Sequence, residues 1–201
     1  MAARFDIRQI GRHVSKEGAD YYPTPPWATR ALMEDVLPDV RGPIWEPACG
    51  GGHMAETLRE YGPVYATDLH DYGYGEQEDF LASKRNSDWI ITNPPFTLAL
   101  EFALHARERA NLGFALLARL QLLEGKARYE KLFSRHAISC YPFVERIGFQ
   151  PGKWDPSNDR GVTAFAWFVW RVDAKTSKLG WIPPGCRDRY TREDDRRWLK
   201  P

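Results

Sequence analysis

The sequence predicts a single α/β domain with a mostly parallel sheet, and three observations support this. Short apolar runs alternate with amphipathic stretches along the chain, which is the pattern of strand–helix–strand units. The 201 residues suffice for one full core, and a content of 43% hydrophobic and 27% charged residues is ordinary for a globular domain. No internal repeat marks a second domain. We therefore expect one domain over residues 1–201, with an arm at 1–21, a core at 22–172 and a tail at 173–201.

The elements of the core follow from apolar periodicity. In chain order we expect a helix at 27–37, a strand leading to Glu46, a helix at 54–61, strands at 64–67 and 88–92, a helix at 98–110, a strand at 113–117, a helix at 125–135, and strands at 137–143 and 162–170. The inward-facing helical residues are predicted to be Met54, Leu58 and Tyr61; Leu98, Phe102 and Ala106; and Tyr129, Leu132 and Phe133. The strand at 162–170 is apolar on both faces, so it belongs inside the sheet. The tail is expected to fold back on the domain through Trp181.

Glycines and carboxylates follow two of these strands. The turn Gly50-Gly51-Gly52 comes after the first strand, and glycines let the backbone approach a ligand at the carboxyl end of an open α/β sheet. The spacing is not that of a dinucleotide-binding G-x-G-x-x-G motif, so the glycines alone are weak evidence. Asp68 ends the next strand about 20 residues later, where a carboxylate meets ribose hydroxyls. Asp79-Phe80 is suitably placed for the adenine end of a nucleoside.

The tetrapeptide Asn93-Pro94-Pro95-Phe96 follows the buried run Trp89–Thr92. Proline fixes φ near −65° and removes the backbone N–H, so this turn offers carbonyl oxygens. The side-chain oxygen of Asn93 and the Pro94 carbonyl can both accept hydrogen bonds from one NH2 group. Phe96 offers a face for stacking on an extruded base. A rigid loop with a core Phe is the alternative reading of these four residues.

Three stretches carry a resemblance: Tyr22-Pro23-Thr24-Pro25-Pro26, Glu46-Pro47-Ala48-Cys49-Gly50 and Asn93-Pro94-Pro95-Phe96. In this order they resemble class I S-adenosylmethionine-dependent amino-methyltransferases, specifically the gamma-ordered DNA N6-adenine methyltransferases of the phage-like orphan type with a catalytic domain only. The resemblance covers roughly residues 20–170. It implies a Rossmann-like, seven-stranded, mostly parallel sheet with an antiparallel last strand and helices on both faces. Phe96 departs from the family, in which Tyr is more usual; stacking survives this change, but any use of a hydroxyl does not.

The resemblance also implies the site. The cofactor S-adenosyl-L-methionine would be bound by Tyr22, Thr24, Pro25, Glu46, Pro47, Ala48, Cys49, Gly50, Gly52, Asp68, Leu69, Asp79, Phe80 and Asn93. The catalytic residues would be Asn93, Pro94, Pro95 and Phe96, which position an adenine amino group for direct methyl transfer without a metal or a covalent intermediate. Glu46 would face the methionine side of the cofactor, and Asp68 the ribose hydroxyls.

Other acceptors remain open. Cytosine N4 presents the same kind of amino group, although Ser usually replaces Asn93 in that subgroup. RNA adenine and protein glutamine amides are methylated by enzymes with this tetrapeptide, and a non-catalytic nucleic-acid-binding relative is the alternative from another class. DNA is the expected partner, with RNA as the alternative.

Recognition of the nucleic acid is predicted from the polar loop Glu145–Gly161, because long polar loops in compact domains are often functional. The predicted substrate-binding residues are Phe96, Arg146, Lys153, Trp154 and Arg160. The three basic residues would contact phosphates, and Trp154 would stack on or wedge beside the flipped base; a merely mobile hairpin tip is the alternative. Gln121 and Glu124 are further candidates. Without a recognition domain, specificity comes from loops and tails, is low, or is supplied by a partner protein or oligomer.

Composition excludes other classes. The formal charge of +1 is not that of a strongly basic nucleic-acid binder. The basic residues of the two tails are either phosphate contacts or ordinary solvated termini (Arg4, Arg8, Arg12, Lys16; Arg187, Arg189, Arg192, Arg196, Arg197). No apolar run reaches 18 residues, so no membrane contact is expected. Three widely spaced cysteines, Cys49, Cys140 and Cys186, suit reduced thiols in a cytoplasm and give no zinc spacing. Cys49 is expected to be small and structural rather than a nucleophile.

Overall fold

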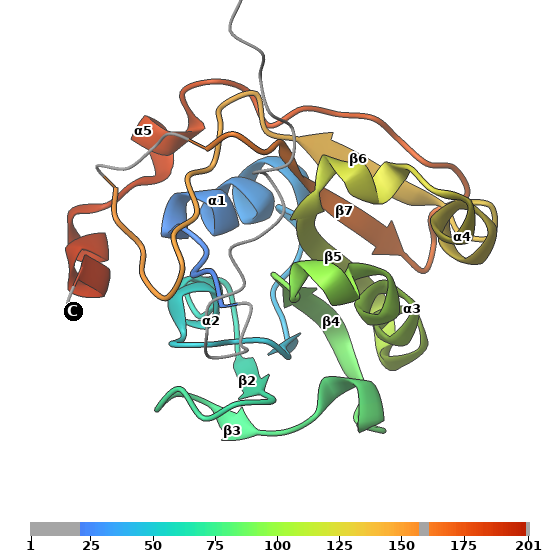
Figure 1. Cartoon of the computed structure of the whole chain (residues 1–201), viewed down its shortest axis with the longest axis horizontal. Coiled ribbons are helices and arrows are strands. Elements are labelled where there is room, and N and C mark those ends of the chain that lie inside the picture. Colours follow the sequence, from blue (N-terminus) through green and yellow to red (C-terminus); the bar gives the residue numbers. More distant parts are fainter. Residues whose placement is uncertain (1–20, 157–160, 200–201) are drawn as a thin grey trace, which may run out of the picture.

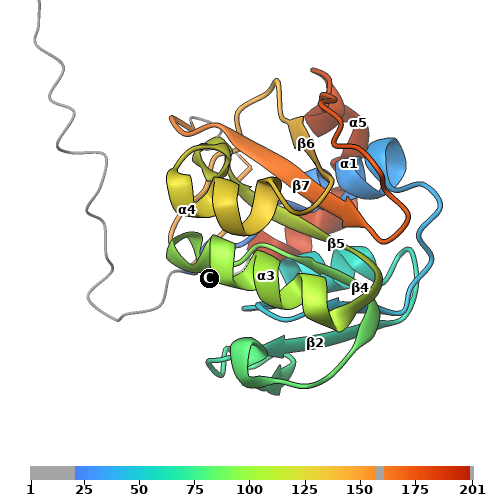
Figure 2. The same cartoon turned by 90° about the vertical axis from the view of Figure 1, so that its right-hand side faces the viewer.

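A computed structural model of the chain describes residues 21–156 and 161–199. Within these residues, seven strands form one sheet in the order β3-β2-β1-β4-β5-β7-β6 (Figures 1 and 2). The strands are β1 Ile44–Glu46, β2 Val64–Asp68, β3 Glu76–Gln77, β4 Ser87–Thr92, β5 Ala110–Arg119, β6 Ile138–Pro142 and β7 Phe165–Arg171. All neighbouring pairs from β3 to β5 are parallel, and β7 is antiparallel to both β5 and β6. The predicted fold class, including the antiparallel last strand, is confirmed.

Helices cover both faces of the sheet (Figures 1 and 2). One face carries α1 Pro26–Ala31, a π-helical segment Leu32–Val36 and α2 His53–Leu58. The other carries α3 Ala99–Arg109 together with α4 Lys126–Arg128 and the π-helical segment Tyr129–Phe133 that follows it. In the tail, α5 Cys186–Tyr190 packs against α1.

The two cores follow from side-chain alternation along the central strands. On β7, Trp167 and Val169 face the α1 side, whereas Phe168 and Trp170 face the α3 side. Successive strand residues point to opposite faces, so a strand that is apolar throughout must be covered twice. This explains why β7 lies between β5 and β6 rather than at an edge, as its composition predicts.

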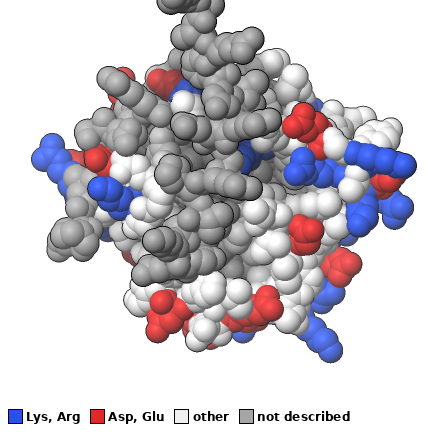
Figure 3. Space-filling model, viewed as in Figure 1, with Lys and Arg blue, Asp and Glu red and all other residues white. Residues whose placement is uncertain are grey.

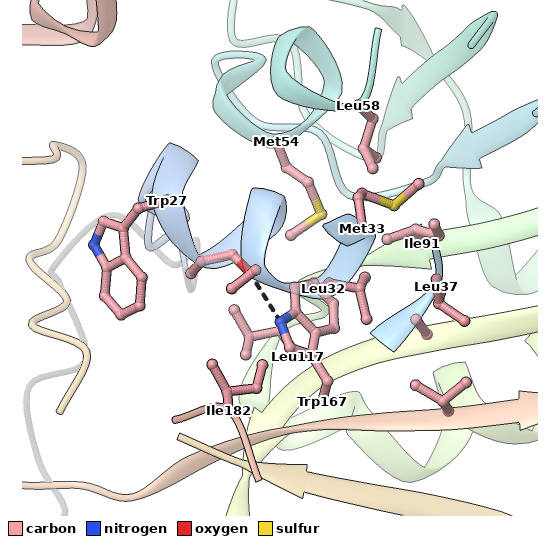
Figure 4. Close-up of a cluster of buried hydrophobic side chains, with 14 of the residues drawn as sticks. Trp27, Leu32, Met33, Leu37, Met54, Leu58, Ile91, Leu117, Trp167 and Ile182 are labelled. Atoms are coloured by element: carbon pink, nitrogen blue, oxygen red, sulfur yellow. Dashed lines mark hydrogen bonds between the residues drawn. The ribbon is translucent and has the colours of Figure 1, made fainter. Parts of the chain in front are cut away.

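The core on the α1 side packs tightly around the first helix (Figure 4). Leu32, Met33 and Leu58 are fully buried there. The indole Nε1 of Trp167 donates a hydrogen bond of 3.1 Å to the carbonyl of Ala28, which satisfies the one polar atom of a buried ring. The helix is thereby fixed to the sheet, and so is the segment that precedes it.

Several local predictions were wrong. Strand β3 was not anticipated, because two exposed residues carry no apolar pattern. Tyr129 was expected to face inward but is 63% exposed, and Leu98, also expected to face inward, is 37% exposed. The helix predicted at 125–135 is a single α-helical turn followed by a π-helical one, which rotates the apolar positions relative to an ideal 3.6-residue period. The tail does fold back on the domain, but through buried Ile182 and Cys186, while Trp181 is 60% exposed.

The tail is anchored by Arg30 of α1. This guanidinium is buried and binds both oxygens of Asp195 at 2.8 Å, and it also binds Glu60. A buried charge is tolerated only when it is paired in this way. The predicted arm at residues 1–21 lies almost entirely outside the described residues. Within the described part of the chain, no helix is both long and apolar enough to cross a membrane.

Candidate functional site

A cavity of about 380 Å³ opens at the carboxyl ends of β1, β2 and β4. The sequence order explains its place, because β1 lies between β2 and β4, and the chain changes direction across the sheet at that point. Open α/β sheets bind ligands at such a reversal. The volume is within the range of small-molecule sites.

The glycine loop after β1 forms one wall. Gly50 and Gly52 have φ values of 48° and 88°, which glycine adopts without strain. The Asp68 carboxylate accepts hydrogen bonds from the Gly50 N–H at 2.8 Å and from the His70 N–H at 3.0 Å. Asp68 therefore holds the glycine loop against the end of β2 while it lines the cavity.

Glu46 ends β1 inside this wall and is 1% exposed. Burial, together with the nearby Asp68 carboxylate, raises the pKa of Glu46 to about 8. The free protein thus keeps Glu46 largely protonated at neutral pH, and a cation in the cavity would draw the proton off. Two carboxyl groups at successive strand ends make this part of the cavity receptive to cations and hydroxyls.

Aromatic side chains cover the glycine loop. The Tyr21 hydroxyl accepts the Gly51 N–H at 3.0 Å, and its ring pairs with that of Tyr72 at a centroid distance of 4.6 Å. A Cβ at Gly50 would lie 2.2 Å from the Tyr21 ring, so only glycine allows this contact. His53, at the start of α2, lies beneath the ring of Trp198 at 4.5 Å, and burial lowers the pKa of His53 to about 4. His53 is therefore neutral at physiological pH.

Asn93 links the turn after β4 to the segment before α1. Its side-chain Nδ2 donates to the carbonyl of Tyr22 at 3.0 Å. Its Oδ1 is buried, and no donor among the described residues reaches it. A buried amide oxygen without a partner costs roughly 1–3 kcal/mol. Asn93 lines the cavity, so this acceptor is available to a ligand N–H group.

Phe96 belongs to an aromatic cluster beside Asn93. Its ring stacks on Tyr22 at 5.2 Å and contacts Phe149 and Phe165 at 6.0 and 5.4 Å. The guanidinium of Arg119 lies over the same ring, 4.6 Å from its centroid. The cluster joins four chain segments that are far apart in the sequence.

The cavity brings together most of the residues predicted to bind a cofactor. Those that line it are Tyr22, Thr24, Glu46, Pro47, Ala48, Cys49, Asp68, Leu69, Asp79, Phe80 and Asn93, and Pro95 joins them. Pro25, Gly50, Gly52, Pro94 and Phe96 are not in the lining. Burial raises the pKa of the Cys49 thiol to about 12, so a nucleophilic thiolate is not formed there. The described residues contain no group of His, Cys, Asp or Glu arranged to hold a metal ion.

Sequence reasoning missed several residues at this site. Tyr21, His53, His70 and Tyr72 line the cavity, and Phe149, Phe165 and Arg119 surround Phe96. His53, Tyr21 and Tyr72 can each be read off the sequence, but nothing in the sequence indicates that they lie together. Their convergence depends on tertiary contacts, for which no local pattern exists.

The loop predicted to contact substrate differs from expectation. Trp154 was expected to present its ring for stacking, but it is only 6% exposed. Arg146 donates from Nη1 to the carbonyl of Val162, which closes the base of the loop. Lys153 is exposed, and Arg160 lies outside the described residues. The aromatic ring that this loop brings to Phe96 is Phe149.

No family model and no curated protein matches this chain by sequence. Its structure is similar to a type I restriction-modification methyltransferase subunit from Streptococcus thermophilus, with a TM-score of 0.60 at 12% identity over 77% of this chain and 45% of that one. It is also similar to a modification subunit of a putative type I restriction enzyme from Vibrio vulnificus, with a TM-score of 0.58 at 14% identity over 88% and 51% of the two chains. The chain thus spans about half the length of these two subunits.

A smaller protein has a similar structure. A putative RNA methyltransferase from Pyrococcus horikoshii matches with a TM-score of 0.53 at 13% identity, over 75% of this chain and 86% of that one. Identities this low establish a shared fold. The chain therefore has the Rossmann-like fold of class I methyltransferases.

Proposed function

We propose that this protein is an S-adenosylmethionine-dependent methyltransferase that methylates the N6 amino group of adenine in DNA. One observation carries the proposal: the buried, unpartnered Oδ1 of Asn93 in a proline-stiffened turn at the edge of the cavity. An amino group supplies the N–H donor that this oxygen lacks. The fold, which it shares with methyltransferases, supports the same reaction class.

The cavity residues fit the cofactor. Asp68 and Glu46 suit ribose hydroxyls and a cationic amino-acid end, and Asp79 and Phe80 border the side expected for adenine. Asp79 accepts the Leu81 N–H through Oδ1, which fixes its carboxylate at the rim. When bound, the cofactor supplies an electrophilic methyl group; the protein supplies orientation.

The acceptor is positioned by the turn after β4. Asn93 Oδ1 and the Pro94 carbonyl would accept the two amino hydrogens, and this draws the nitrogen lone pair out of conjugation with the base. Nδ2 is occupied by the Tyr22 carbonyl, so the amide presents its oxygen rather than its nitrogen. The geometry therefore selects a donor such as an amino group over a carbonyl.

A nucleic acid is the acceptor that best suits the aromatic cluster. A base that leaves its stack needs an apolar face to lie against, and Phe96 is three residues after Asn93 in a turn where both residues contact Tyr22. Tyr22 stacks on Phe96, so a base would replace or join Tyr22 there. Arg146, Lys153 and Arg160 stay predicted contacts to the phosphates, whereas Trp154, which was predicted to contact the base, is 6% exposed and does not present its ring for stacking. We further propose that a partner protein or a second copy adds sequence recognition; the similar proteins from Streptococcus thermophilus and Vibrio vulnificus are themselves subunits.

The test is transfer of a labelled methyl group from the cofactor to DNA, RNA and protein, compared side by side, with Asn93→Ala as the inactive control. We expect label in DNA with the parent enzyme and none with the variant. Label in RNA alone would move the assignment to an RNA adenine methyltransferase, as the Pyrococcus horikoshii similarity suggests. Label in protein alone, or equal transfer by Asn93→Ala, would overturn the proposal.

A further inference from the structure

Charge is distributed unequally around the cavity. The segment 68–79, from the end of β2 through β3, contains five acidic and no basic side chains, a formal charge of −5. The connection between β5 and β6, residues 119–137, contains five basic and two acidic side chains, a formal charge of +3. In Figure 3, acidic side chains lie along the lower edge, over β2 and β3, and basic ones gather at the right, over α4. The net charge of +1 conceals this asymmetry.

Arg119 joins the basic connection to the aromatic cluster. It is the last residue of β5, is exposed, and lies over the ring of Phe96. No carboxylate among the described residues forms an ion pair with it, although the molecule pairs many of its other arginines. An exposed guanidinium held only by an aromatic face retains its donors for a phosphate or a base.

The rest of the connection presents its charges outward. Arg128 donates from Nη1 to the carbonyls of Gln121 and Glu124, which fixes the turn that leads into α4. On this support, the side chain of Lys126 is 85% exposed in a loose, exposed ion pair with Glu130 at 3.7 Å, and Lys131 is also exposed. Tyr129 lies between them in the sequence with 63% exposure. Basic groups interleaved with an exposed aromatic ring are the features of a single-strand nucleic-acid surface.

The loop 145–161, which the sequence predicted to contact the nucleic acid, has less positive charge and no exposed tryptophan. Residues 145–161 contain three basic and three acidic side chains, so their formal charge is zero. Its tryptophan is buried, and Arg146 is used within the loop. A polyanion approaching the cavity is repelled by the segment 68–79 and gains little from a neutral loop.

We propose that Arg119 and the β5–β6 connection hold the phosphates of the nucleic-acid strand that delivers its base to Asn93. This inference rests on the proposed function, since it names the path of the same substrate. Arg119 anchors the strand next to the target base, and Lys126 and Lys131 contact phosphates farther along. Tyr129 stacks on an unpaired base.

The test is nucleic-acid binding measured by fluorescence anisotropy over a range of salt concentrations, with labelled single- and double-stranded DNA. Lys126→Ala/Lys131→Ala should lower the slope of log K against log salt by up to about two units on duplex, close to one per lost phosphate contact. Arg119→Gln should lower it by about one unit, and Arg119→Lys should restore most of this change. Tyr129→Ala should weaken binding to single strands about 5- to 100-fold with an unchanged slope.

Matched controls separate this surface from general charge effects. Lys175→Ala/Lys178→Ala removes two exposed lysines from a segment on the β6–β7 side, remote from Asn93, and should leave the slope unchanged. Lys153→Ala measures the predicted phosphate contact of the loop 145–161, and it should lower the slope by less than the connection variants do. Cofactor affinity, measured by calorimetry, should stay at the parent value in all these variants.

The outcomes distinguish the two proposals. If the parent enzyme methylates DNA but the connection variants keep the parent slope, the inference about the strand path is overturned and the proposed function stands. If Lys153→Ala changes the salt slope more than the connection variants do, the inference about the strand path is likewise overturned and the proposed function stands. A parent enzyme that neither binds nor methylates nucleic acid overturns both.

Discussion

The two sides of the cavity are built differently. The proposed cofactor side contains the strand ends at Glu46 and Asp68, and each carboxyl group belongs to the last residue of its strand. The acceptor side is formed by a cluster around Phe96, to which Tyr22, Phe149 and Phe165 come from separate segments. The residues of the cofactor side lie at the ends of strands that local sequence patterns predict. The residues of the acceptor side come together only when the chain folds.

The difference also concerns electrostatics and solvation. On the cofactor side a buried acid with a raised pKa stands ready for a cation. On the acceptor side, the unpartnered amide oxygen of Asn93 is available to a base, and Arg119, which lies on the ring of Phe96, is available to a phosphate. The buried, unpartnered oxygen of Asn93 lowers stability where it lies, and a hydrogen-bond donor on a ligand would relieve it.

The largest expected effect is on the acceptor side. Asn93→Ala should lower the rate of methyl transfer about 1,000-fold, equivalent to about 4 kcal/mol, as for removing one polar group that acts on the transition state. Cofactor affinity should change far less. Single-turnover kinetics and calorimetry measure the two quantities. The exposed Asn86→Ala is the control, and a rate for Asn93→Ala near that of the parent would refute the role of Asn93.

The second largest expected effect is at Trp154. Because its ring is buried, its replacement should change stability rather than base stacking. Trp154→Ala should lower the free energy of unfolding by about 3 kcal/mol, since it removes a buried aromatic side chain. The matched control is Trp181→Ala, which removes an indole that is 60% exposed and should alter stability little. Denaturant unfolding measures both. An unchanged midpoint for Trp154→Ala, with slower transfer on duplex than on single strands, would restore the original stacking role.

On the cofactor side, Asp68→Ala should weaken cofactor binding by about 1–3 kcal/mol, because it removes a partner for hydroxyls and releases the Gly50 N–H. The control is Asp71→Ala, an exposed neighbour whose carboxylate accepts only the Gly73 N–H among the described contacts. Isothermal titration calorimetry compares the variants. Equal affinity of Asp68→Ala and the parent would remove Asp68 from the cofactor site.

The last expected effect is a pH dependence set by Glu46. A folded-state pKa of about 8, above the ordinary value of 4.5, means that the free protein loses stability as pH rises between these values. A cationic ligand favours the ionised form, so cofactor affinity should rise from pH 6 to 8 by up to about tenfold per unit and then level off. Calorimetry in buffers of different ionisation enthalpy should show proton release at pH 7, which Glu46→Gln should abolish. Binding without proton release in the parent would contradict the raised pKa.

The sequence predicted the fold correctly, and it placed Glu46, the glycine turn and Asp68 at the same edge of the sheet, for a physical reason. Strand-end carboxylates and the glycine turn at 50–52 must lie at one edge of a parallel sheet, so local patterns determine their place. On the acceptor side, the sequence predicted Asn93-Pro94-Pro95-Phe96 and the loop 145–161. Phe149 and Arg119 carry no local signal, because their role arises from contact with Phe96. Trp154 was misplaced because a polar neighbourhood in the sequence does not reveal which ring turns inward.

The central claim is that Asn93 acts on an exocyclic amino group of a base. Digestion of enzymatically methylated DNA to nucleosides, followed by mass spectrometry, identifies the modified atom directly. The account predicts N6-methyladenine as the product, absent when Asn93→Ala replaces the parent enzyme. Methylcytosine as the sole product, or a methylated nucleoside formed equally well by Asn93→Ala, would contradict it.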